Sequence, residues 1–196
     1  MKHSAQSEGE FSRLPDQQLG YSPEEVLSFF NRLADDYQLI LTNPSTGQQV
    51  STSRTIREVS FRTEAGGYSP KEVDQALDRV EDRFSELERR LYIQDYGLAA
   101  WQEAVAELRQ LLEGRLNRPA GQRFRRPSKR GVKGYRVQDV DAFCQLMSQH
   151  LAGEEKLHPD QLRALAFRSA RRAASYEERQ VDAFVDTCIE YLLDTL

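Results

Sequence analysis

The sequence predicts an all-α fold of tandem turn-helix repeats around one long, partly coiled-coil helix. Three observations support this prediction. A tyrosine-centred pattern occurs four times in the 196 residues, a hydrophobic heptad begins within its second copy, and no proline occurs between Pro70 and Pro119. Hydrophobic steps of three and four residues mark one face of a helix, and proline interrupts helices, so all three observations favour helical structure.

The pattern consists of a tyrosine followed by hydrophobic residues five, eight, twelve and sixteen positions later. We number the copies as repeats 1 to 4, and their tyrosines are Tyr21, Tyr68, Tyr135 and Tyr176. A phenylalanine precedes each tyrosine by seven to eleven residues, at Phe11, Phe61, Phe124 and Phe167. The variable distance predicts a loop of adjustable length between the two aromatic residues.

Local signals predict where the helices of the repeats begin. In repeats 1 and 2 the tyrosine is followed by Ser-Pro-x-Glu, which combines a capping box with proline at the first helical position. These helices should therefore begin at Pro23 and Pro70. Glycine precedes the tyrosine in three repeats, which predicts a turn with positive φ at Gly20, Gly67 and Gly134.

Three aspartates follow the first hydrophobic position of the pattern, at Asp74, Asp141 and Asp182. We interpret them as partners of the helix dipole and of the helix cap, because acidic side chains are favoured in the first turn of a helix. A catalytic role is not predicted for them.

The residues F…GY…EVD from Phe61 to Asp78 resemble the repeated N-terminal domain of DivIVA-type proteins. The four copies together are similar to an actinobacterial group of proteins with several such domains. This resemblance implies a cytoskeletal scaffold of bacterial cell poles and division septa, which dimerises as a parallel coiled coil. It also implies a membrane-facing loop before Gly-Tyr that carries an aromatic and a basic residue. In this chain Val132-Lys133 is the pair that keeps an apolar residue followed by a basic one.

The chain divides into five segments on these patterns. They are repeat 1 (residues 1–41), a polar linker (42–55), repeat 2 with the long helix (56–118), a basic loop with repeat 3 (119–155) and repeat 4 (156–196). The long helix should run from Pro70 to about Arg118, with an interruption at Tyr96-Gly97. Pro159 should open a further helix, and the last helix should span about residues 177–193.

A heptad seam runs along the long helix through Val73, Leu77, Val80, Phe84, Leu87 and Leu91. Charged residues flank it so that a parallel two-stranded coil would bring opposite charges together. We therefore predict a homodimer through this seam. An intramolecular helical bundle is the alternative, because it requires the same periodicity.

Residues 115–136 are strongly basic, although the chain as a whole has a net charge of −4. The candidate contact residues for a membrane or an acidic partner are Arg123, Phe124, Arg125, Arg126, Lys129, Arg130, Val132 and Lys133. Clustered cations attract anionic lipid, and they equally attract acidic groups of the same chain or a partner. They also attract nucleic-acid phosphates, so a nucleic-acid-binding regulator that uses segment 115–136 is the alternative function.

The remaining sequence gives no sign of an enzyme or of a cofactor. It has no nucleophile elbow, phosphate-binding loop or dinucleotide fingerprint, and its two cysteines and three histidines lack metal-ligand spacing. The absence of a disulfide pattern, signal peptide or long apolar run favours a cytoplasmic protein. We expect a non-enzymatic scaffold or adaptor without cofactor or metal. It should bind protein partners, including a DivIVA-like scaffold, and lie at the inner face of the cell membrane at a pole or septum.

Overall fold

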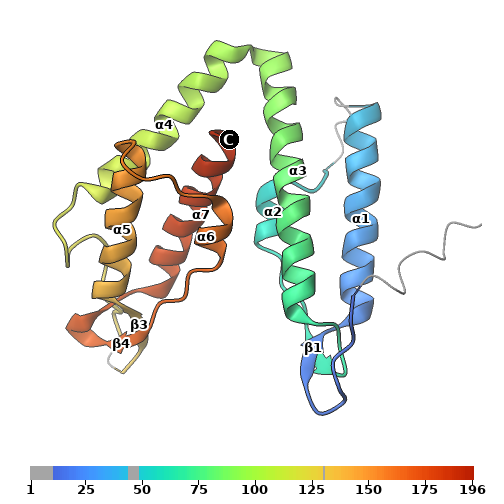
Figure 1. Cartoon of the computed structure of the whole chain (residues 1–196), viewed down its shortest axis with the longest axis horizontal. Coiled ribbons are helices and arrows are strands. Elements are labelled where there is room, and N and C mark those ends of the chain that lie inside the picture. The colour runs from blue at the N-terminus through green and yellow to red at the C-terminus, as the bar shows by residue number, and fades with distance from the viewer. Residues whose placement is uncertain (1–10, 44–48, 130) are drawn as a thin grey trace, which may run out of the picture. The chain divides into compact units, whose positions relative to one another are not determined.

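The computed structural model describes residues 11–43, 49–129 and 131–196 (Figure 1). The chain divides into two compact units, Met1–Tyr92 and Ile93–Leu196, which we call unit 1 and unit 2. Unit 1 contains repeats 1 and 2, and unit 2 contains repeats 3 and 4. The described residues form seven α-helices, which confirms a mainly helical fold. Small antiparallel sheets, which the all-α prediction did not include, join the repeats.

Unit 1 consists of two long helices, one short helix and a two-stranded sheet. Its elements are β1 (Leu19–Tyr21), α1 (Pro23–Thr42), α2 (Ser53–Arg57), β2 (Thr63–Ala65) and α3 (Pro70–Tyr96), whose last turn extends past the end of the unit. Both long helices begin at the predicted prolines. The short helix α2 includes the end of the predicted polar linker, of which residues 44–48 lie outside the described part of the chain.

Unit 2 contains three longer helices, one short helix and a three-stranded sheet. Its elements are α4 (Leu98–Leu116), β3 (Lys133–Arg136), α5 (Val137–Leu151), α6 (Pro159–Arg163), β4 (Ser169–Arg171), a 3-10 helix (Arg172–Ala174), β5 (Ser175–Tyr176) and α7 (Glu178–Asp194). The predicted interruption of the long helix is confirmed, because Gly97 separates α3 from α4 with a φ of 89°.

The two repeat tyrosines of each unit pair with each other through antiparallel backbones. Tyr21 and Tyr68 exchange backbone hydrogen bonds of 2.9 and 2.8 Å, and Tyr135 is paired with Tyr176 in the ladder of β3 and β5. Repeats 1 and 2 therefore pair within unit 1, and repeats 3 and 4 pair within unit 2.

The glycine before the tyrosine serves this pairing, and the predicted positive φ is wrong. Gly20, Gly67 and Gly134 are not among the glycines with positive φ. A Cβ on Gly20 would lie 2.4 Å from the carbonyl oxygen of Tyr68, and one on Gly134 would lie 2.0 Å from that of Tyr176. Glycine is required at these positions because two backbones cross without room for a side chain.

Each phenylalanine packs against the tyrosine of the other repeat in its unit. The ring centroids are 5.5 Å apart for Phe11 and Tyr68, 5.4 Å for Phe61 and Tyr21, 5.2 Å for Phe124 and Tyr176, and 5.2 Å for Phe167 and Tyr135. These distances suit tilted or edge-to-face aromatic packing. The two repeats of a unit thus exchange their aromatic side chains reciprocally.

The residue after each phenylalanine is also held by the other repeat. Its N–H donates to a side chain four residues past the partner tyrosine, in the pairs Ser12 to Glu72, Arg62 to Glu25, Arg125 to Gln180 and Arg168 to Asp139. Its carbonyl accepts the N–H of the residue that follows that tyrosine, at 2.7 to 2.9 Å. The predicted capping box of α1 is therefore wrong: Ser22 forms no side-chain cap, and Glu25 is used by the other repeat.

The hydrophobic seam of α3 packs inside unit 1. Val73, Phe84 and Leu87 are buried, and Leu77, Val80 and Leu91 are partly buried against the same clusters. Their neighbours include Phe29, Leu33 and Ile40 of α1. These are the contacts of the intramolecular alternative, and a dimer through the same residues would have to displace α1. The homodimer stays a prediction.

Candidate functional site

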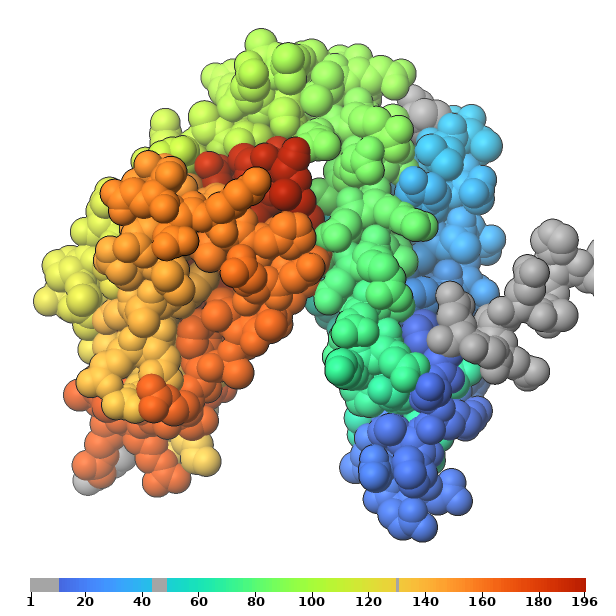
Figure 2. Space-filling model, in the orientation of Figure 1, coloured from blue at the N-terminus to red at the C-terminus, as the bar shows by residue number. Residues whose placement is uncertain are grey.

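The described surface of unit 2 carries a cluster of cations at the start of β3 and the end of β4. We call Lys129, Val132, Lys133, Arg171 and Arg172 the basic tip; all five are exposed. Figure 2 shows β4 and the turn after it, in orange red, at the surface of one end of unit 2. The basic tip combines two segments that lie far apart in the sequence.

Strand pairing places two of these cations opposite each other. Lys133 faces Arg171 in the antiparallel ladder of β3 and β4. Like charges directly opposite in such a ladder destabilise it. Among the described residues neither side chain has a hydrogen-bond or ion-pair partner. This arrangement lowers stability, so a requirement other than folding explains it better.

Arg172 adds a second unfavourable feature at the same place. Its φ of 55° is the one left-handed backbone among the described residues other than glycine. Such a conformation strains a side chain with a Cβ, and strained residues concentrate at functional sites. Arg172 thus adds a fourth cation to Lys129, Lys133 and Arg171 in the basic tip.

An apolar side chain lies among the cations. Val132 is 48% exposed, and it lines a shallow pocket of about 190 Å³ together with Lys129, Lys133 and Pro127. Glu177, Glu178 and Arg179 also line this pocket. The basic tip therefore offers both positive charge and a small hydrophobic contact.

Two other arginines near the tip, Arg168 and Arg136, form hydrogen bonds within the chain. Arg168 donates to Asp139 at 2.9 Å, and this hydrogen bond is the main cause that lowers the pKa of Asp139 to about 2. Arg136 donates to Gln138. Because these two arginines form hydrogen bonds within the chain, they are not counted in the basic tip.

Two of the eight predicted contact residues are buried, and their prediction as surface contacts is wrong. Phe124 is 4% exposed, because it packs between Tyr176 and Phe184. Arg123 forms a nearly buried ion pair of 3.0 Å with Asp141. The intrachain alternative for the basic segment therefore holds at Arg123.

Of the other predicted contact residues, one is partly buried and forms contacts within the chain, and four are exposed. Arg126 is partly buried, where it donates to the carbonyl of Ser175 at 3.1 Å and lies over the ring of Tyr176. Arg125 is exposed, as are Lys129, Val132 and Lys133. Arg130 lies outside the described residues.

The sequence analysis missed Arg171 and Arg172. In repeat 4 the pair that corresponds to Val132-Lys133, three and two residues before the tyrosine, is Ala173-Ala174, so the repeat pattern does not point to the arginines. The sequence feature that could have identified these residues is the pair Arg171-Arg172. It becomes informative once repeats 3 and 4 are known to pair in antiparallel fashion. A pair of cations that face each other on two strands cannot be recognised from the sequence of one repeat alone.

The repeated aspartates form hydrogen bonds with the tyrosines of the repeats. The hydroxyl of Tyr176 donates to Asp141 at 3.1 Å. Burial, then a hydrogen bond to Asp182, raises the pKa of Tyr135 to about 12. Burial also raises the pKa of Asp74, and its hydrogen bond with Tyr21 acts against that rise. In each case the tyrosine and the aspartate belong to different repeats of one unit, so these acids contribute to repeat pairing.

The corresponding end of unit 1 has a different surface. There Leu19 is paired with Ala65, and Gly20 with Glu64, so no two cations face each other in this ladder. Leu19 is 66% exposed, and Asp16 is exposed on the loop before β1. Among the described strand ladders, facing cations occur in unit 2 and not in unit 1, which provides a natural control surface.

None of the protein-family models, curated proteins and solved structures compared with this chain matches it. Within residues 11–43, 49–129 and 131–196, no group of three or more His, Cys, Asp or Glu side chains is placed to hold a metal ion. No helix in those ranges combines the length and the apolar character needed to cross a bilayer.

Proposed function

We propose that this protein is a non-enzymatic scaffold or adaptor of the DivIVA type that contacts an anionic membrane surface through the basic tip. The observation that carries the proposal is the unpaired, directly opposed Lys133 and Arg171, with Arg172 held beside them at positive φ. An anionic surface relieves the repulsion between these cations. Val132 supplies an apolar side chain that can enter the headgroup region.

The expected strength of this contact is low. A basic residue near an anionic membrane contributes on the order of 1 kcal/mol, so the four cations contribute about 4 kcal/mol, which corresponds to a dissociation constant of about 1 mM. One tip therefore gives reversible binding. Stable attachment would need several tips at once, which agrees with the proposed self-association and protein binding of a scaffold.

The small number of cations favours lipid over nucleic acid. Tight non-specific binding to nucleic acid needs many phosphate contacts. The basic tip is a short strand pair and a turn with four exposed cations and the exposed Val132. The chain carries a net charge of −4, which disfavours wrapping by nucleic acid.

Vesicle sedimentation of the whole protein tests this proposal. We expect the protein to sediment with vesicles of phosphatidylcholine and phosphatidylserine, to remain soluble with phosphatidylcholine alone, and to be released by salt. A short duplex DNA serves as the competing polyanion. Salt-sensitive binding to the duplex without sedimentation on anionic vesicles would replace the lipid proposal with the nucleic-acid alternative.

A further inference from the structure

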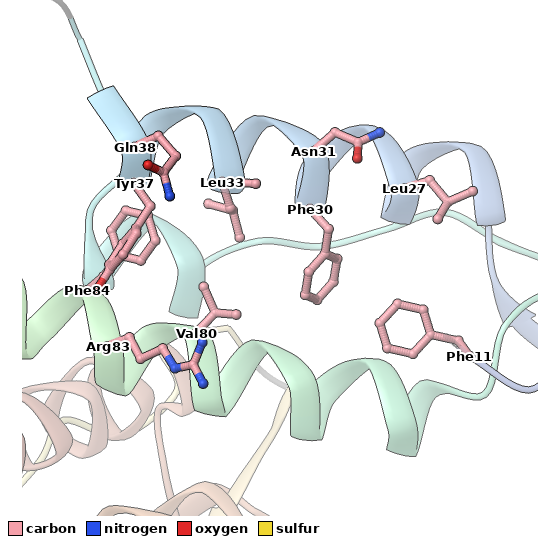
Figure 3. Close-up of a pocket in the computed structure, with 11 residues that line it drawn as sticks. Phe11, Leu27, Phe30, Asn31, Leu33, Tyr37, Gln38, Val80, Arg83 and Phe84 are labelled. Atoms are coloured by element: carbon pink, nitrogen blue, oxygen red, sulfur yellow. The ribbon is translucent and has the colours of Figure 1, made fainter. Parts of the chain in front are cut away.

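We propose that a groove of unit 1, between α1 and α3, binds an amphipathic helix of a partner protein that carries an acidic side chain opposite Arg83. The groove has a volume of about 460 Å³. Figure 3 shows Phe30 of α1 and Val80 of α3 pointing into the space between the two helices, with Arg83 next to Val80. All of its lining residues belong to unit 1. This proposal does not depend on the membrane contact of unit 2.

Within the described part of the chain, three of the four repeats have a helix in the equivalent groove. Each such helix precedes the phenylalanine of its repeat and inserts hydrophobic side chains: Ile56 from α2, Leu112 and Leu116 from α4, and Leu162 from α6. The open groove is the one lined by Phe11, the phenylalanine of repeat 1. No helix precedes Phe11 among the described residues.

The position fifteen residues after each tyrosine identifies these grooves as equivalent. In repeat 1 this position is Asp36, which accepts the N–H of Ser51 at 2.9 Å where the chain enters α2. In repeat 3 it is His150, whose Nδ1 accepts the N–H of Leu157 at 3.1 Å where the chain enters α6. The side chain at this position thus faces the segment that fills the groove.

In the third filled groove, the residue fifteen positions after the tyrosine faces α4. It is Tyr191 in repeat 4, and its hydroxyl hydrogen-bonds to Arg109 of α4. In repeat 2 the position is Arg83, which lines the open groove. Among the described residues Arg83 has no hydrogen-bond or ion-pair partner. By this equivalence, Arg83 is placed to contact the helix that fills the groove.

The chemistry of the groove defines its occupant. Phe30, Val80 and Phe84 require hydrophobic side chains, and α4 shows that two leucines four residues apart, Leu112 and Leu116, suit the equivalent groove. Arg83 requires an acid where α4 has Arg109, because a second cation there would be repelled. The occupant is therefore an amphipathic helix with a leucine pair and an acid about one turn before it.

The segment before Phe11 does not have this chemistry. Residues 1–10 lie outside the described part of the chain, and Met1 and Ala5 are their only hydrophobic residues. Neither a leucine pair nor any other pair of large aliphatic residues occurs there. Residues 1–10 thus lack the hydrophobic side chains that the groove requires.

A charge exchange between peptide and protein tests the proposal. The probe is a fluorescein-labelled peptide of residues 98–117, prepared with the native sequence and with Arg109→Glu, and binding to the full chain is followed by anisotropy. We expect the R109E peptide to bind the native protein about two- to fivefold more tightly than the native peptide does, a ratio typical of one exposed ion pair. Arg83→Glu should reverse the preference.

Two tryptophan variants on α1 locate the binding. Ala34→Trp fills the groove from its exposed edge and should abolish binding of both peptides, whereas Ser28→Trp, exposed on α1 outside the groove, should leave binding unchanged. Binding that survives Ala34→Trp, or a peptide preference that Arg83→Glu does not alter, would overturn the proposal. A large gain in affinity on deletion of residues 2–10 would also overturn it, by assigning the groove to that segment.

Discussion

Replacement of Gly134 by alanine will lower the free energy of unfolding of unit 2 by about 3 kcal/mol, the upper part of the range for overpacked sites. The new Cβ would lie 2.0 Å from the carbonyl oxygen of Tyr176, an atom of the backbone that cannot move aside alone. The strands β3 and β5 must separate to make room. This separation would disturb the packing of Phe124 on Tyr176 and of Phe167 on Tyr135.

A second glycine of the same unit provides the matched control. Gly114 lies inside α4, and a Cβ built on it has no neighbour within 4 Å. Gly114→Ala should therefore stabilise unit 2 by about 0.5–1 kcal/mol, since alanine is a better helix former than glycine. Urea unfolding followed by the fluorescence of Trp101, the single tryptophan of the chain, reports on this unit. Equal unfolding midpoints for both variants would contradict the crossing of the two backbones.

Replacement of Lys133 by glutamate will change membrane binding and stability in opposite directions. Binding to anionic vesicles should fall by at least about 30-fold, because one attraction is lost and a repulsion is added, together about 2 kcal/mol. At the same time the glutamate would face Arg171 and form a favourable cross-strand pair. We expect a gain in stability of roughly 0.2–1 kcal/mol.

Lys156→Glu is the control for the change in net charge. Lys156 is exposed between α5 and α6 in the same unit and lies outside the basic tip. Vesicle titration and thermal unfolding should show that this variant binds nearly as well as the native protein. If both lysine variants lose binding equally, net charge rather than the tip governs the interaction. If Lys133→Glu lowers stability, the facing cations Lys133 and Arg171 do not destabilise the native protein.

Local sequence signals predicted the helix boundaries well. Pro23, Pro70 and Pro159 each stand at the first position of a helix, and Gly97 ends α3. These signals act through the backbone preferences of single residues, so they can be read without knowledge of the partners. The mainly helical fold follows from them and from the hydrophobic periodicity.

The pairing of repeats could not be predicted in the same way. The seam residue Phe84 shows the periodicity that either a second chain or α1 can satisfy, and in the structure it packs beside Tyr37 of α1. Phe124 lies in a basic segment, which suggested exposure, whereas its partner Tyr176 comes from another repeat. Arg171 joins the site only through its strand partner Lys133. Each of these cases concerns a contact between repeats, which sequence spacing within one repeat does not encode.

A fluorescent probe at position 132 tests most directly whether the basic tip contacts membranes. Val132→Cys can be labelled with an environment-sensitive dye without removal of Cys144 and Cys188, because both are buried and burial raises their thiol pKa values, to about 12 for Cys144. With vesicles that contain phosphatidylserine, we predict a blue shift of the dye at position 132 and none for a dye at Leu19→Cys in unit 1. A shift at position 19 alone, or at neither position while the protein is bound, would contradict the account.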